Sequence, residues 1–215
     1  MSCNKCSKFG LIYSNPNIKS PVDFIEGNGD SKIWIIGLNP KTEVGKEFSP
    51  TYEELSSFSP NQHSYFLDFK KVSPKFYQNW ESKNSNIAHT DLVKCGSPSF
   101  PPNNPNTNEK LKSKDTKEII SNCLEHLKSQ ILLYRPQLII CNGSFTSQAI
   151  FENFSPDDKS IKSCKDVGSY ISSLDNHKIK IILTGFIGRI DDWSKRRLGI
   201  EIEESIRELG INIEC

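Results

Sequence analysis

Short apolar runs alternate with helical patterns along most of the chain. Four runs predict buried strands: three of them are short, largely apolar and rich in β-branched residues, and residues 88–93 mix apolar with polar positions. They cover residues 33–37, 88–93, 138–141 and 179–183. The strands are too short for membrane-spanning segments and have the length of strands in a buried sheet.

Apolar residues at helical spacing predict the helices between these strands. A helix begins near Asp115 and ends at Pro136, and another covers residues 192–209. Ser144 is expected to cap a helix that runs to Phe151. Short helices are expected at residues 52–58 and 64–71, whereas residues 96–114 are rich in Pro, Asn and Ser and predict a loop.

Apolar strands that alternate with helices indicate a parallel sheet covered on both faces. We therefore predict an α/β fold, a three-layer α/β/α arrangement with a central four-stranded parallel sheet, as a single domain over residues 1–215. Ligands of such sheets bind beyond the carboxyl ends of the strands. The chemistry is therefore expected in four segments, residues 37–40, 91–95, 142–144 and 184–186.

Composition narrows the class of protein. No apolar run reaches the roughly 18 residues that span a bilayer, and the N-terminus lacks the apolar core of a signal peptide. We therefore expect a cytoplasmic monomer that does not bind membranes. The net charge is only +1, from 27 basic and 26 acidic residues. Such a balance does not by itself indicate a nucleic-acid binder, although a local basic patch is sufficient for phosphate contacts.

The chain contains seven cysteines, and in a reducing compartment clustered cysteines favour metal sites over disulfides. Cys3 and Cys6, together with Cys95 and Cys123, would supply the four thiolates that an iron–sulfur cluster requires. Zinc accepts the same donor set. The alternative is that Cys95 and Cys123 are ordinary buried core thiols.

Several motifs resemble those of one enzyme family. Gly37-Leu38-Asn39-Pro40 resembles the first catalytic motif of the uracil-DNA glycosylase superfamily, and residues 90–95 resemble the second-strand motif of its iron–sulfur branch, ending in the same Val-Lys-Cys. Cys3 and Cys6 match the N-terminal Cys-x-x-Cys of that branch. The pattern of its central helix and third strand is followed by Cys123, Leu127, Gln130, Pro136 and Gly143.

This resemblance implies a divergent DNA glycosylase with DNA as its partner. It also implies a 4Fe–4S cluster, with zinc less favoured, held by Cys3, Cys6, Cys95 and Cys123. The catalytic residues that it indicates are Asn39 and Asp91. The residues that it places at the substrate are Leu38, Pro40, Phe48, Asn142, Gly185, Phe186 and Arg189.

Asn39 occupies the position that handles the attacking water in several branches. The iron–sulfur branch typically has a glutamate one residue earlier, where this chain has Leu38, so the task shifts to Asn39. An asparagine is no strong base, but its carbonyl oxygen can hold a water. This suits a reaction in which the base leaves before water attacks. Phe48 matches the phenylalanine that stacks on the flipped base, although a core position is the alternative.

Asp91 replaces an asparagine that is common in uracil-specific relatives. An ionised aspartate presents only acceptors, so it repels a carbonyl oxygen and accepts from an exocyclic amino group, as acidic side chains read cytosine. Because a general cytosine glycosylase would destroy its own genome, we expect a modified cytosine, such as the glucosylated hydroxymethylcytosine of T-even phages. This suggests an antiviral role. A protonated Asp91 that reads uracil is the alternative.

The third motif is also altered, because residues 184–189 contain no histidine to stabilise the leaving base. Backbone N–H groups or Arg189 are the remaining candidates, and Phe186 or Ile187 is expected to wedge the duplex. His89 is expected to be a packing residue. Residues 195–197 are basic and either contact phosphate or form a solvated helix face.

Four functions therefore stay open. The first is a monofunctional glycosylase that removes a modified cytosine, and the second is a uracil-DNA glycosylase in base excision repair. The third is a catalytically inactive iron–sulfur DNA-binding protein, and the fourth is a zinc-stabilised α/β protein that binds no nucleic acid.

Overall fold

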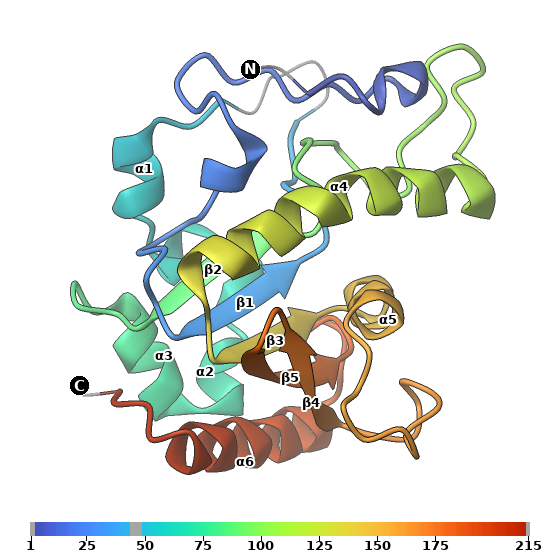
Figure 1. The fold of residues 1–215 in the computed structure, drawn as a ribbon. Helices are drawn as coiled ribbons and strands as arrows, with labels where there is room; N and C mark the ends of the chain where they lie inside the picture. The colour runs from blue at the N-terminus through green and yellow to red at the C-terminus, as the bar shows by residue number, and fades with distance from the viewer. Residues whose placement is uncertain (1–2, 44–48, 214–215) are drawn as a thin grey trace.

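The sheet confirms the predicted α/β architecture. The computed structural model describes residues 3–43 and 49–213. The sheet has the strand order β2-β1-β3-β5-β4 (Figure 1). The four predicted strands run parallel, as β1 (Ile33–Gly37), β2 (Ile87–Asp91), β3 (Leu138–Asn142) and β5 (His177–Thr184).

A fifth strand, β4 (Ser169–Leu174), pairs antiparallel with β5 at one edge. Its side chains alternate between buried Tyr170 and Ser172 and their more exposed neighbours. The sequence did not predict this strand, because three serines conceal the alternation. An antiparallel edge strand on an otherwise parallel sheet is a common arrangement.

Helices cover both faces of the sheet, which gives the predicted three layers (Figure 1). Because successive strand residues point to opposite faces, Trp34 and Ile36 pack into one core and Ile33 and Ile35 into the other. The first core lies beneath α4 (Ser113–Tyr134) and α5 (Ser144–Asn153). The second core lies against α2 (Phe69–Val72), α3 (Pro74–Glu81) and α6 (Asp192–Glu208). A short helix, α1 (Tyr52–Ser56), precedes them in the chain.

Three local expectations need correction. The helix expected at residues 64–71 is divided into a 3-10 turn at Ser64–Phe66 and α2. Helix α3 was missed, although Ser73 accepts from the backbone N–H of Phe76 and Pro74 follows it, which is a recognisable start signal. Ser144 is the first residue of α5 and not its cap; Gly143, with φ 125°, takes that place.

Two close contacts fix the layers around the site. Gly199 of α6 packs so tightly on α2 that an added Cβ would lie 1.9 Å from the carbonyl oxygen of Val72. On the outer side of β2, Glu26 and His89 exchange two backbone hydrogen bonds of 2.8 Å. The N-terminal segment thus lies beside the edge strand.

In the described part of the chain, no helix is long and apolar enough to cross a membrane.

Candidate active site

The carboxyl ends of the parallel strands meet at one edge of the sheet, where a cavity of about 570 Å³ opens. The register places Gly37 beside Asp91 and Asn142 beside Thr184. Seven of the residues singled out in the sequence line this cavity: Leu38, Asn39, Asp91, Asn142, Gly185, Phe186 and Arg189. The strand ends therefore bring together segments that lie far apart in the sequence.

A second, smaller cavity of about 210 Å³ adjoins the first. Pro40 lines it, and the two cavities share Lys41, Tyr65 and Asp91. Phe48, the expected stacking residue, lies outside the described residues.

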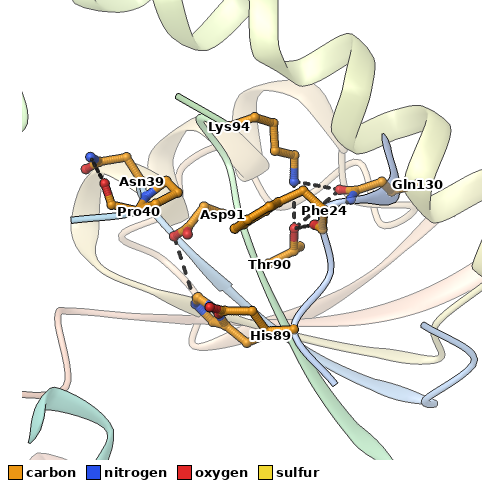
Figure 2. Close-up of polar contacts among 9 residues, drawn as sticks. Phe24, Asn39, Pro40, His89, Thr90, Asp91, Lys94 and Gln130 are labelled. Carbon is orange, nitrogen blue, oxygen red and sulfur yellow. Dashed lines mark hydrogen bonds and ion pairs between the residues drawn. The ribbon is translucent and has the colours of Figure 1, made fainter. Parts of the chain in front are cut away.

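Asn39 is held in one orientation by its amide group. Its Nδ2 donates to Ser97 Oγ at 2.9 Å and to the carbonyl oxygen of Pro40 at 3.0 Å, a contact drawn in Figure 2. Ser97 Oγ gives its own proton to the carbonyl oxygen of Ser99, so it can only accept from Asn39. Because both neighbours are acceptors, the amide nitrogen must face them. The Oδ1 of Asn39 then remains as an acceptor, with no donor among the described residues.

Asp91 ends β2 and stands in a row with two other buried polar side chains. The Nδ1 of His89 lies 2.5 Å from Glu26 Oε2, and its Nε2 lies 3.9 Å from Asp91 Oδ1 (Figure 2). All three residues are less than a tenth exposed. The imidazole therefore stands between two carboxyl groups. His89 also packs against the ring of Phe66, with 4.8 Å between centroids, so the packing role expected for it describes only part of its contacts.

Gly37 provides the space for this row. A Cβ at this position would lie 2.3 Å from Asp91 Oδ1 and 2.9 Å from His89 Nε2. A side chain would therefore collide with both groups at once. The glycine at the end of β1 is required here by close approach.

Burial and neighbouring charges shift the pKa values of the row. Burial raises the pKa of Asp91 to about 6, partly offset by the charges of His89 and Lys94, while Glu26 raises it further. Burial lowers the pKa of His89, but the charge of Asp91 and the contact with Glu26 more than compensate, so the net direction is upward. Near neutral pH, Asp91 is therefore mainly an ionised carboxylate that presents acceptors.

Tyr65 lines both cavities and was not identified from the sequence. Its ring lies 4.3 Å from that of Phe66 and 6.4 Å from that of Phe186, measured between centroids. Burial, followed by the charge of Asp91, raises the pKa of Tyr65, so its hydroxyl stays protonated. Tyr65 lies in an aromatic-rich polar stretch that offered no periodic signal.

The loop after β5 separates the two expected wedge residues. Ile187 is fully buried, and its backbone N–H donates to Asn142 Oδ1 at 2.9 Å, so the suggestion that Ile187 is the wedge is wrong. Phe186 is 37% exposed and lies at the cavity, where it can reach a substrate. Asn142 is buried and uses its side-chain oxygen to hold this loop against β3.

The basic residues 195–197 do not act as one group. Lys195 is buried, and its Nζ lies 3.1 Å from Asp68 Oδ1, so it holds α6 to the segment before α2. Arg196 and Arg197 are exposed. Phosphate contact from this segment is therefore restricted to the two arginines.

The amino end of α5 also opens on the cavity, through Ser144, Phe145 and Thr146. No side chain caps this helix, and the buried hydroxyl of Thr146 has no hydrogen-bond partner among the described residues. The free N–H groups of a helix start carry partial positive charge. This side of the cavity therefore favours a negative group.

Lys94 joins the second motif to α4. Its Nζ donates to Thr90 Oγ1 and Gln130 Oε1, both at 2.6 Å, and Gln130 Nε2 donates to the carbonyl oxygen of Phe24 at 2.9 Å (Figure 2). The side chain is fully buried, and burial lowers the pKa of Lys94 to about 7. The network ties β2, α4 and the N-terminal segment into one unit behind Asp91.

The four cysteines of the expected cluster lie in one region. Cys6, Cys95 and Cys123 belong to one buried core cluster, and Cys3 packs against it. Asn122 Nδ2 donates to Cys6 Sγ at 3.5 Å. Four thiols are the donor set that an iron–sulfur cluster uses. However, within the described ranges, no three His, Cys, Asp or Glu side chains are arranged so that they could hold a metal ion.

Comparison with known proteins identifies one family. The model of the uracil DNA glycosylase superfamily matches residues 24–186, which is most of the chain and includes the strand ends that form the cavity. None of the curated proteins with which the sequence was compared matches it significantly.

Proposed function

Because the chain belongs to the uracil DNA glycosylase superfamily, we propose that it is a monofunctional DNA glycosylase that removes a modified cytosine and leaves an abasic site. The family supports DNA glycosylase chemistry with DNA as the substrate. The choice of base rests on one observation. The group that faces both cavities beside the buried His89 is the carboxyl of Asp91.

Asp91 favours a base with an exocyclic amino group. A carboxylate accepts the N4 hydrogens of cytosine, as Glu and Asp do when they read this base. The same carboxylate repels the O4 oxygen of uracil. Since burial raises the pKa of Asp91 only to about 6, the acceptor form dominates at neutral pH.

Asn39 is the proposed holder of the attacking water. Its Nδ2 is fixed by Ser97 and Pro40, so its Oδ1 is the acceptor that a water below the sugar C1′ would use. A neutral amide cannot remove a proton early in the reaction. This favours a route in which the C1′–N bond breaks first, and water attacks the oxocarbenium-like sugar.

The negative charge of the departing base must be stabilised without a histidine in the loop after β5. Three positive groups open on the cavity: the ammonium of Lys41, the guanidinium of Arg189 and the uncapped amino end of α5. Each lowers the energy of an anion developing at the base. Phe186 is the proposed wedge that fills the space left in the duplex when the nucleotide is flipped out.

In this proposal, the requirement for a modified base keeps the enzyme from attacking the DNA of its host. An enzyme that removed ordinary cytosine would attack its own genome, whereas a modified cytosine marks foreign DNA, such as the glucosylated hydroxymethylcytosine of phages. The smaller cavity beside Asp91 offers room for a substituent next to the amino group. An antiviral role follows from this choice of base.

Uracil is the second candidate, and the pKa of Asp91 favours it under acidic conditions. A protonated carboxyl donates a hydrogen bond, which the O4 of uracil can accept. With a pKa of about 6, this form is populated below neutral pH. The same side chain can therefore read either base, depending on its protonation.

The base is tested with duplexes that carry cytosine, uracil or glucosylated hydroxymethylcytosine, followed by cleavage of abasic sites. We expect release of the modified cytosine, at least about a hundredfold slower in Asn39→Ala because water positioning is lost. Asp91→Asn should shift the preference towards uracil, whereas Asp166→Asn, an exposed acid-to-amide control, should behave like the wild type.

The outcomes separate the candidates. Robust uracil release with none from the modified cytosine would assign the protein to base excision repair. DNA binding without abasic product on any duplex, and with no effect of Asn39→Ala, would make it an inactive DNA-binding protein.

We also propose that Cys3, Cys6, Cys95 and Cys123 hold a 4Fe–4S cluster, which would fasten the N-terminal segment to β2 and α4. The support is the donor set: four thiols in one region, three of them buried, with Asn122 Nδ2 donating to Cys6. Visible absorption together with iron and acid-labile sulfide in the purified protein tests the cluster. Zinc without sulfide would replace it, and Cys164→Ser is the matched control for substitution of Cys95.

A further inference from the structure

We propose that Glu26 and His89 are positioning residues that hold Asp91 in its ionised, acceptor-only form and so set the base that the cavity accepts. This inference rests on the proposed function, because it takes Asp91 as the residue that reads the base. Neither Glu26 nor His89 belongs to the motifs that carry the family resemblance.

The geometry of the row carries the inference. His89 Nδ1 lies 2.5 Å from Glu26 Oε2, and its Nε2 lies 3.9 Å from Asp91 Oδ1. The distance to Asp91 allows an ion pair but is too long for a hydrogen bond. Two carboxyl groups beside one imidazole favour its protonated form more strongly than a single carboxyl group would. The charged ring then favours the ionised state of Asp91.

The row is buried and mechanically fixed, so it does not exchange freely with solvent. His89 is 3% exposed and lies against Phe66 and Phe58. Two backbone hydrogen bonds hold Glu26 directly beside His89. Gly37 leaves the gap through which Nε2 faces the Asp91 carboxyl. The contacts thus fix which atom of each group faces the next.

Other charged or titratable groups face Asp91 from the surrounding elements. They are Lys94 after β2, Lys41 and Glu43 after β1, His63 and Tyr65 before α2, and Arg189 after β5. The charge of His89 lowers the pKa of Asp91 more than any other neighbour, and that of Glu26 raises it. Glu26 acts on Asp91 in two opposite ways: its charge raises the pKa of Asp91 directly, while its contact with His89 favours the protonated ring, whose charge lowers that pKa.

The test measures Asp91 directly and the base preference separately. The carboxyl carbon of Asp91 is titrated by NMR in aspartate-labelled protein, with Asp91→Asn identifying the signal. His89→Gln keeps a hydrogen-bond donor for Glu26 but removes the cation, so the pKa of Asp91 should rise by about 1 to 3. Glu26→Gln should raise it less. His177→Gln, at the opposite end of the sheet, should leave it unchanged.

The activity arm compares kcat/KM for glucosylated hydroxymethylcytosine and for uracil in duplex DNA at pH 7.5. Each unit by which the pKa of Asp91 rises changes the ratio of its two forms tenfold, so the preference for the amino-bearing base should fall by about ten- to a thousandfold in His89→Gln. The pH at which the two rates are equal should move upwards by as many pH units as the pKa of Asp91 rises. A role limited to packing would not move this crossing point.

An unchanged pKa of Asp91 in folded His89→Gln overturns the inference, whatever the enzyme excises. If His89→Gln does not fold, His89→Asn decides by the same titration, because it also removes the cation and keeps a polar amide. A raised pKa with an unchanged base preference keeps the positioning role but refutes base reading by Asp91, and therefore the proposed function.

Discussion

Substitution of Gly37 by alanine tests whether the space between β1 and Asp91 is essential. The new Cβ would lie 2.3 Å from Asp91 Oδ1, about 1 Å closer than van der Waals contact allows, and 2.9 Å from His89 Nε2. Both neighbours belong to β2, which is paired with β1 at this point. The carboxyl must therefore move by about 1 Å, or the strands must separate.

Both consequences have an expected size. A displacement of about 1 Å at a reacting group lowers the rate by roughly a hundredfold, equivalent to about 2.7 kcal/mol of transition-state stabilisation. Overpacking at a buried position lowers the free energy of unfolding by about 1 to 3 kcal/mol. In a chain of this size, the melting temperature should then fall by roughly 2 to 12 °C.

The assay measures kcat/KM on the best duplex substrate and the melting temperature of the same preparations. Gly168→Ala is the matched control, because an added Cβ at Gly168 meets no atom within 4 Å and its backbone is not in the left-handed region. A Gly37→Ala protein with wild-type activity and stability would refute the reasoning, since it would show that Asp91 and His89 do not occupy this space.

Three further predictions follow from the same contacts. Because the pKa of Asp91 is about 6, release of the amino-bearing base should decline as the pH falls through 6, while uracil release rises; a ratio of the two rates that stays constant from pH 5 to 8 would contradict this. Phe186→Ala should lower kcat/KM on duplex DNA about tenfold and less on single strands, since the wedge acts on the duplex, whereas Leu133→Ala on α4 should change neither rate. Gly199→Ala should lower the free energy of unfolding in urea by about 3 kcal/mol, because its Cβ would meet the backbone of Val72, and an unchanged midpoint would argue against this helix packing.

Most of the sheet could be predicted because buried parallel strands usually have continuous apolar sequences. The segments over Ile33–Gly37 and Leu138–Asn142 have no polar face, so period and length were sufficient. Strand β4 escaped because one of its faces meets solvent and its serines resemble a turn. Helix α3 was not predicted because residues 41–86 have little periodicity. The helix expected in this stretch was placed at residues 64–71, just before α3.

The candidate site was predictable where residues follow strands directly. Asn39 and Asp91 stand at the ends of β1 and β2, and parallel topology alone brings such positions together. Glu26 could not be found in this way, because it belongs to no strand and reaches the site by pairing beside β2. Its partner His89 looked like core, since a buried imidazole and an apolar residue occupy the same position in the pattern.

The pairing of Glu26 with His89 has a consequence for association between molecules. β2 is an outer strand of the sheet, and an open outer strand offers backbone groups to which a strand of another chain can add. Two of these groups are already taken by the N-terminal segment. Detachment of that segment would free the outer edge of the strand that carries Asp91 and would take Glu26 away from His89. The same event would therefore open an edge for self-association and dismantle the row of buried side chains at the cavity.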